Sequence, residues 1–127
     1  MTAPVIRGLR HLALKVTDIR RSRAFYERLF DMRVVWQPDP DHVYLTSGSD
    51  NLALHQIPFE ELGEYLGTHG QFMGHFGFVV ETPQDESYSV YLADPDDNTI
   101  QVLYEPRISG LELMQADERQ AVPTPNS

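Results

Sequence analysis

Two stretches decide the fold of this chain, and they share one layout: Arg10-His11-Leu12-Ala13-Leu14-Lys15-Val16 and, beginning 64 residues later, Gly74-His75-Phe76-Gly77-Phe78-Val79-Val80. Each stretch has one histidine that leads into an apolar segment. Both halves also end alike, because Asp50-Asn51 and Asp97-Asn98 each precede a second apolar segment. A repeat of this size indicates two copies of one supersecondary unit, with a histidine at the same point of each copy.

The first copy reads as a strand at residues 5–16, a helix and three further strands. From His11 onward, polar and apolar residues alternate, as in a strand with one buried face. Asp18 is placed to cap a helix, and apolar residues then recur at helical spacing from Ile19 to Phe30. The later strands are expected at residues 33–37, 42–46 and 52–57, with turns at 38–41 and 47–51.

The second copy is shorter. Strands are expected at residues 74–80, 87–92 and 99–104, but no helix follows the start signal at Thr82-Pro83-Gln84-Asp85. Ala53 and Gln101, which anchor the closing strands, are 48 residues apart, so this copy is about 16 residues shorter than the first. Either the chain truly lacks a helix and a strand, or the natural protein carries residues here that this sequence lacks. We favour the second explanation, because Glu86 leads from a cap into a strand without a turn.

The expected organisation is therefore a first module at 1–58, a linker at 59–73, a second module at 74–106 and a polar tail at 107–127. Residues 59–66 are expected to form a short helix within the linker. The formal net charge of −9 argues against nucleic acid as a partner, since phosphate binding needs clustered cations. No apolar run reaches the length of a membrane span and no leader is seen, so a cytoplasmic protein is expected. The chain has no cysteine, which excludes thiolate ligands.

Three stretches carry a resemblance to a known family: residues 10–27, residues 74–78, and Asp94-Pro95-Asp96-Asp97-Asn98-Thr99-Ile100-Gln101-Val102. In this ordered set the chain resembles the vicinal oxygen chelate superfamily, which includes glyoxalase I, bleomycin-binding proteins, fosfomycin-resistance proteins and extradiol dioxygenases. The resemblance implies an α+β fold of paired βαβββ modules, which form open U-shaped mixed sheets around a metal.

The resemblance also implies metal ligands on the first and last strand of each module. Carried onto this sequence, those positions are His11, Ala53, His75 and Gln101. The two histidines suit a divalent ion such as Fe, Mn, Ni or Zn. Ala53 has no donor atom, and Gln101 stands where the family usually has Glu, so its neutral amide is a weaker ligand.

His55 is the candidate catalytic residue. It lies two positions after Ala53 and therefore points to the same side of its strand. It either replaces the missing ligand or acts as an acid/base, and the competing interpretation is a polar residue at the edge of a sheet. Glu105, four residues past Gln101, is expected to be a solvated residue too distant to serve.

The expected function is that of a divalent-metal-dependent enzyme, of dioxygenase or lyase type, acting on a small substrate with vicinal oxygens. The alternative is a metal-free protein of the same fold that binds and sequesters a drug or antibiotic, which the residues at positions 53 and 101 favour. A weaker third alternative is a structural module without an enclosed pocket. Because family sites often combine strands of two subunits, the chain is expected to form a homodimer.

Overall fold

The computed structural model describes residues 3–67, 73–81 and 87–104. The chain divides into two compact units, which are described separately: one comprises Met1–Met73 with Ala93–Asn98, and the other Gly74–Leu92 with Thr99–Ser127. The predicted helix start at Thr82–Asp85 and the predicted tail at 107–127 lie outside the described residues. In the described part of the chain, no helix has the length and apolarity needed to cross a membrane.

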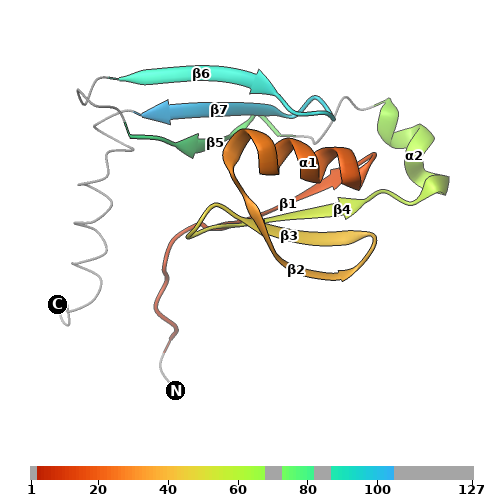
Figure 1. Ribbon diagram of the computed structural model, residues 1–127, viewed down its shortest axis with the longest axis horizontal. Coiled ribbons are helices and arrows are strands. Elements are labelled where there is room, and N and C mark those ends of the chain that lie inside the picture. Colours follow the sequence, from red (N-terminus) through yellow and green to blue (C-terminus); the bar gives the residue numbers. More distant parts are fainter. Residues whose placement is uncertain (1–2, 68–72, 82–86, 105–127) are drawn as a thin grey trace. The chain divides into compact units, whose positions relative to one another are not determined.

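The first unit contains a four-stranded mixed sheet, called sheet A below. Its strands run in the order β1-β4-β3-β2, and Figure 1 shows them side by side. The bounds are β1 His11–Val16, β2 Arg33–Asp39, β3 His42–Thr46 and β4 Asn51–Gln56. β1 is parallel to β4, while β3 is antiparallel to both β4 and β2. The predicted βαβββ order of the first copy is confirmed.

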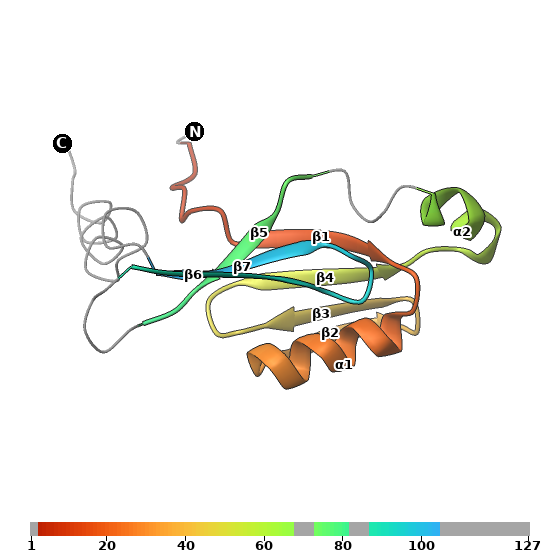
Figure 2. The same ribbon diagram turned by 90° about the horizontal axis from the view of Figure 1, so that it is seen from above.

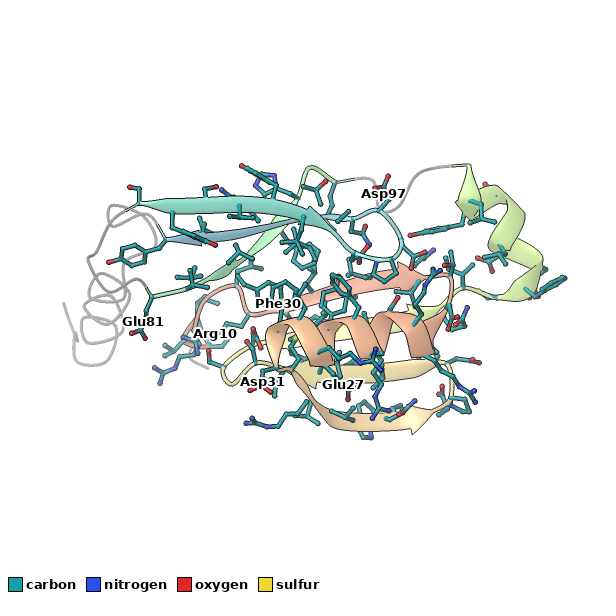
Figure 3. All side chains as sticks on the ribbon, turned by 45° about the horizontal axis from the view of Figure 1, so that its top comes forward. Arg10, Glu27, Phe30, Asp31, Glu81 and Asp97 are labelled. Atoms are coloured by element: carbon teal, nitrogen blue, oxygen red, sulfur yellow. The ribbon has the colours of Figure 1, made fainter. Side chains whose placement is uncertain are left out.

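Helix α1 (Ile19–Phe30) lies along one face of sheet A (Figures 1 and 2). The predicted cap is present, because the Asp18 carboxylate accepts hydrogen bonds from the backbone N–H groups of Arg20 and Arg21 at 3.1 and 3.2 Å. The helix ends at Asp31, which takes the left-handed conformation with φ 53° and follows Phe30 in Figure 3. On the face of sheet A toward α1, apolar side chains form the core, and the fully buried ones are Leu14, Val16, Val43, Leu45 and Leu54.

Two predicted boundaries in this unit were wrong. The first strand was expected from residue 5 but begins at His11, where its partner β4 also begins. The turn expected at 38–41 is confined to residues 40–41, because β2 continues through Pro38 to Asp39. Proline is tolerated there because β2 is the edge strand and its pairing with β3 is irregular on both sides of Trp36.

Helix α2 (Phe59–Leu66) follows sheet A and confirms the predicted short helix. The second unit contains a three-stranded sheet, called sheet B, with the order β5-β7-β6. Its strands are β5 Phe76–Val79, β6 Tyr88–Ala93 and β7 Thr99–Tyr104. Sheet B therefore reproduces the order β1-β4-β3 of sheet A, and the described residues include no counterpart of β2. The shorter second copy is confirmed, and residues 80–87, which join β5 to β6, leave no room for a helix and a strand like α1 and β2.

Candidate functional site

His11 begins β1 on the face of sheet A opposite the core. Its Cα partner on β4 is Asn51, and its Nδ1 lies 2.7 Å from the Asn51 side-chain oxygen. An amide oxygen only accepts hydrogen bonds, so the imidazole nitrogen must donate. In a neutral ring this leaves Nε2 unprotonated, with a lone pair that can bind a metal ion. Asn51 therefore fixes the orientation of the His11 ring, a contact that the sequence alone did not reveal.

Ala53 lies on the same face and is fully buried. Its Cα partners are Ala13 on β1 and Tyr44 on β3. The alanine side chain has no donor atom, so it supplies no ligand at this position of sheet A. The Tyr44 ring stacks on Trp36 at 5.0 Å, so aromatic side chains occupy this part of the face.

His55 follows on this face and lies opposite His42 on β3. The two imidazole centroids are 4.9 Å apart, and the ring planes cross at 73°. The pKa of His55 is lowered, first by burial and then by the positive potential of His42 and of His11. His55 is therefore held toward its neutral form, which is the form that accepts a proton or binds a metal.

A cavity of about 450 Å³ opens beside His55 within the first unit. Its polar lining includes Lys15, Asp41, His42 and Glu61, and Phe59 contributes an apolar wall. A volume of this size suits a small molecule. His55 is thus a predicted site residue that lines a cavity.

In the second unit, His75 and Gln101 lie on the same side of sheet B. Gln101 is the Cα partner of Gly77 on the parallel strand β5, and His75 is two residues before Gly77. The Gln101 side-chain NH₂ donates to the Ser89 hydroxyl at 2.8 Å, and the His75 ring meets the Tyr91 ring edge-on at 5.6 Å. A ligand role for Gln101 would use the amide oxygen, since its nitrogen is engaged.

Sheet A thus brings His11 and His55 to one face, and sheet B does the same for His75 and Gln101. Within residues 3–67, 73–81 and 87–104, no three His, Asp or Glu side chains form a group able to hold a metal ion. Each unit thus holds two of the predicted site side chains: His11 and His55 lie in the first unit, and His75 and Gln101 lie in the second. Glu105 lies outside the described residues.

His42 was not among the predicted site residues. Its pairing with His55 was nevertheless within reach of the sequence, because a hairpin about the turn at 47–50 sets position 42 opposite position 55. Its second partner, Asp39, lies in β2, and the Asp39 carboxylate oxygen is 2.8 Å from His42 Nδ1. That contact depends on β2 extending through Pro38, which local sequence signals did not indicate.

The model of the Glyoxalase/Bleomycin resistance protein/Dioxygenase superfamily matches residues 8–87, more than half of the chain. The chain belongs to this superfamily. The match spans both histidine-led repeats and confirms the resemblance to vicinal oxygen chelate proteins. None of the curated proteins compared with the chain gives a match.

Solved structures of this superfamily share the fold. Lactoylglutathione lyase from Agrobacterium tumefaciens is 19% identical with a TM-score of 0.56, and the match covers 76% of this chain and 92% of that one. The fosfomycin resistance protein FosX from Mesorhizobium loti is 19% identical with a TM-score of 0.59, covering 79% and 93%. FosX from Listeria monocytogenes is 16% identical with a TM-score of 0.62, covering 85% and 98%. At these identities the likeness concerns the fold.

Proposed function

We propose that this superfamily member is a divalent-metal-dependent enzyme, of dioxygenase or lyase type, that acts on a small substrate with vicinal oxygens. His11, His75 and Gln101 are its metal ligands, and the ion is of the Fe, Mn, Ni or Zn class. The observation that carries the proposal is the hydrogen bond from His11 Nδ1 to Asn51, which leaves Nε2 of a neutral ring as the ligating atom.

Sheet B supports the same assignment. His75 is exposed, and the half-buried Gln101 has its amide nitrogen fixed by Ser89. An amide oriented through its nitrogen presents its oxygen in a defined direction, as ligands held by outer hydrogen bonds do. Two imidazole nitrogens and an amide oxygen bring no negative charge to a metal ion. A divalent ion bound by them would therefore keep its full charge and attract the anionic oxygens of a substrate strongly.

When bound, the ion would polarise the vicinal oxygens of the substrate and stabilise negative charge that develops on them. His55 would act as the base. Its lowered pKa keeps the imidazole neutral near pH 7, and it lines the cavity in which a small substrate fits. Trp36 and Tyr44, stacked on the same face, would hold an apolar part of the substrate away from water.

We further propose that the protein works as a homodimer in the cytoplasm. Support for the dimer comes from sheet B, where the exposed Tyr88 and Val90 share one face of β6. A second copy that covers these side chains would remove apolar surface from water. Light scattering coupled to size-exclusion chromatography should give twice the mass of the chain; a monomer at all concentrations would reject this part of the proposal.

Metal titration tests the central proposal. Isothermal titration with Mn²⁺, Ni²⁺, Zn²⁺ and, without oxygen, Fe²⁺ should show binding that falls at least ~10-fold in His11→Ala, in His75→Ala and in Gln101→Ala. Asn51→Ala should weaken binding by roughly 10–100-fold, since it removes the partner that sets the His11 ring. Gln37→Ala, which removes an exposed amide from β2, is the matched control for Gln101 and should bind as the wild type does. Unchanged affinity in the histidine variants would sink the proposal.

The second candidate is a metal-free protein that binds a drug or antibiotic. The buried Ala53 favours it, because this position of sheet A offers no donor atom. It predicts no metal binding above that of the His11→Ala, His75→Ala double variant, together with direct binding of a small molecule. Fosfomycin and lactoylglutathione, which the names of the structural relatives contain, are the first probes. Binding that is independent of added metal would favour this candidate over the enzyme.

A further inference from the structure

A second pair of histidines lies on sheet A and is distinct from the ligands proposed above. His42 and His55 face each other across the antiparallel strands β3 and β4. We propose that this pair binds one divalent transition-metal ion of the class that prefers imidazole ligands, namely Cu²⁺, Ni²⁺ or Zn²⁺. Neither residue occupies a position at which the superfamily resemblance implies a ligand.

The separation of the two rings fits a shared ion. With a metal–nitrogen distance of about 2.0–2.1 Å, the ion lies about 3.2 Å from the centroid of each ring that binds it. Bond angles between about 90° and 109° at the ion then set the two centroids about 4.5–5.2 Å apart. The separation in the structure is 4.9 Å. Because the strands are paired, this spacing is fixed by the backbone and requires no loop to move.

Asp39 prepares His42 for this role. Its carboxylate oxygen is 2.8 Å from His42 Nδ1 and, being ionised, accepts a hydrogen bond from that nitrogen. A carboxylate on one imidazole nitrogen with a metal on the other is the usual arrangement around protein-bound metals.

The surroundings also favour a cation. Asp41 and Glu61 line the same cavity as the two histidines, against one cation, Lys15, among its lining residues. With Asp39, three carboxylates thus lie around the pair. Two protein ligands leave further coordination positions open toward the cavity for water or a small molecule. An ion bound here would occupy the His55 lone pair, so we also expect it to compete with the role of His55 as a base.

The test uses the His11→Ala, His75→Ala double variant, in which both histidine ligands of the proposed function are absent. Calorimetric titration with Zn²⁺ should still give one equivalent bound. Adding His42→Gln or His55→Gln should weaken this binding at least 10-fold, and adding Asp39→Asn should weaken it by roughly 10-fold. Electron paramagnetic resonance with Cu²⁺ should show hyperfine coupling to two imidazole nitrogens, and to one in either glutamine variant.

Glutamine keeps a polar side chain at the strand positions, and circular dichroism checks that each variant is folded. No Zn²⁺ or Cu²⁺ binding by the double variant would overturn the inference. Equal affinity in the folded His42→Gln and His55→Gln variants would overturn it as well. If the proposed function fails, the wild type and the double variant bind the same single equivalent, so the two failures are distinguishable.

Discussion

The Tyr26 hydroxyl donates a hydrogen bond to the Asp94 carboxylate at 2.6 Å, joining the middle of α1 to a turn 68 residues later. Both side chains are buried. The same carboxylate also accepts from the side-chain NH₂ of Asn98 and from the backbone N–H groups of Asp96 and Asn98, each at 2.9 Å. A buried charge with this many donors is satisfied, so the bond fixes the turn to the helix without leaving an unpaired group.

Replacing Tyr26 by Phe should lower the free energy of unfolding by about 1.5–3 kcal/mol, since a buried hydrogen bond to a charged acceptor is lost. Urea denaturation measures the change. Tyr65→Phe is the control, because its hydroxyl donates to the Lys15 carbonyl at an exposed site and its loss should cost under about 0.5 kcal/mol. Equal losses in the two variants would show that the hydrogen bond to Asp94 stabilises the protein no more than an exposed hydrogen bond does.

The same contact predicts a loss of stability at alkaline pH. Burial raises the pKa of Tyr26, and the hydrogen bond to Asp94 and the charge of Asp94 raise it further. In the unfolded chain the phenol ionises near its ordinary pKa of about 10. Below that pH, the contribution of Tyr26 to the free energy of unfolding is fully present. As the pH rises above it, only the unfolded chain loses the phenol proton, which stabilises the unfolded state and reduces this contribution. The wild type should therefore lose about 1 kcal/mol of its advantage over Tyr26→Phe between pH 10 and 11; an advantage that stays constant over this range would contradict the raised pKa.

Asp96 gives a third prediction. Its carboxylate accepts from the Thr17 backbone N–H at 3.1 Å and from the Thr17 hydroxyl, and it lies 3.7 Å from the Arg21 guanidinium. Asp96→Asn places an amide NH₂ among these donors and should destabilise the protein by about 1–3 kcal/mol in thermal or urea unfolding.

Asp97→Asn is the matched control for that substitution. Asp97 is exposed in the same turn (Figure 3) and has φ 67°, a left-handed conformation that Asn tolerates. The expected change is under about 0.5 kcal/mol. Should Asp97→Asn cost as much as Asp96→Asn, the effect would belong to the charge of the turn and not to the contacts of Asp96.

Sequence patterns predicted correctly the elements whose bounds depend on residues within the element itself. The bounds of α1 follow from the Asp18 cap and the apolar spacing, and both lie within the helix itself. The start of β1 could not be found this way, since it depends on where β4 begins to pair with it. Pro38 likewise looked like a turn residue, but its place in an edge strand depends on β3.

The residues of the candidate site were likewise predictable only where the sequence itself marks them. The repeat singled out His11 and His75, because it compares the chain with itself. The contacts of Asn51 with His11 and of His42 with His55 arise from pairing between strands. The residues that flank Asn51 and His42 in the sequence do not indicate these contacts. The sequence indicates a turn at residues 94–98 but not that Asp94 and Asp96 are buried. Hydrogen bonds from Tyr26 and Thr17, together with those inside the turn, offset the cost of burying the two carboxylates.

Gly77 supplies the last prediction, which concerns the position of Gln101. A Cβ added at Gly77 would lie 2.7 Å from the Gln101 carbonyl oxygen and 3.0 Å from Leu103 Cδ2. The first contact is with backbone, so β5 and β7 must separate to admit a methyl group. Gly77→Ala should therefore destabilise the protein by about 1–3 kcal/mol and move Gln101.

Gly74→Ala is the control for this substitution, because a Cβ at Gly74 meets no atom within 4 Å. It should leave both the unfolding midpoint and metal affinity unchanged. If Gln101 ligates the ion, folded Gly77→Ala should also bind metal more weakly than the wild type, as 1 Å of displacement is large against a metal–ligand bond. A folded Gly77→Ala protein with wild-type affinity would separate the packing of β5 on β7 from metal binding, and would remove Gln101 from the ligand set.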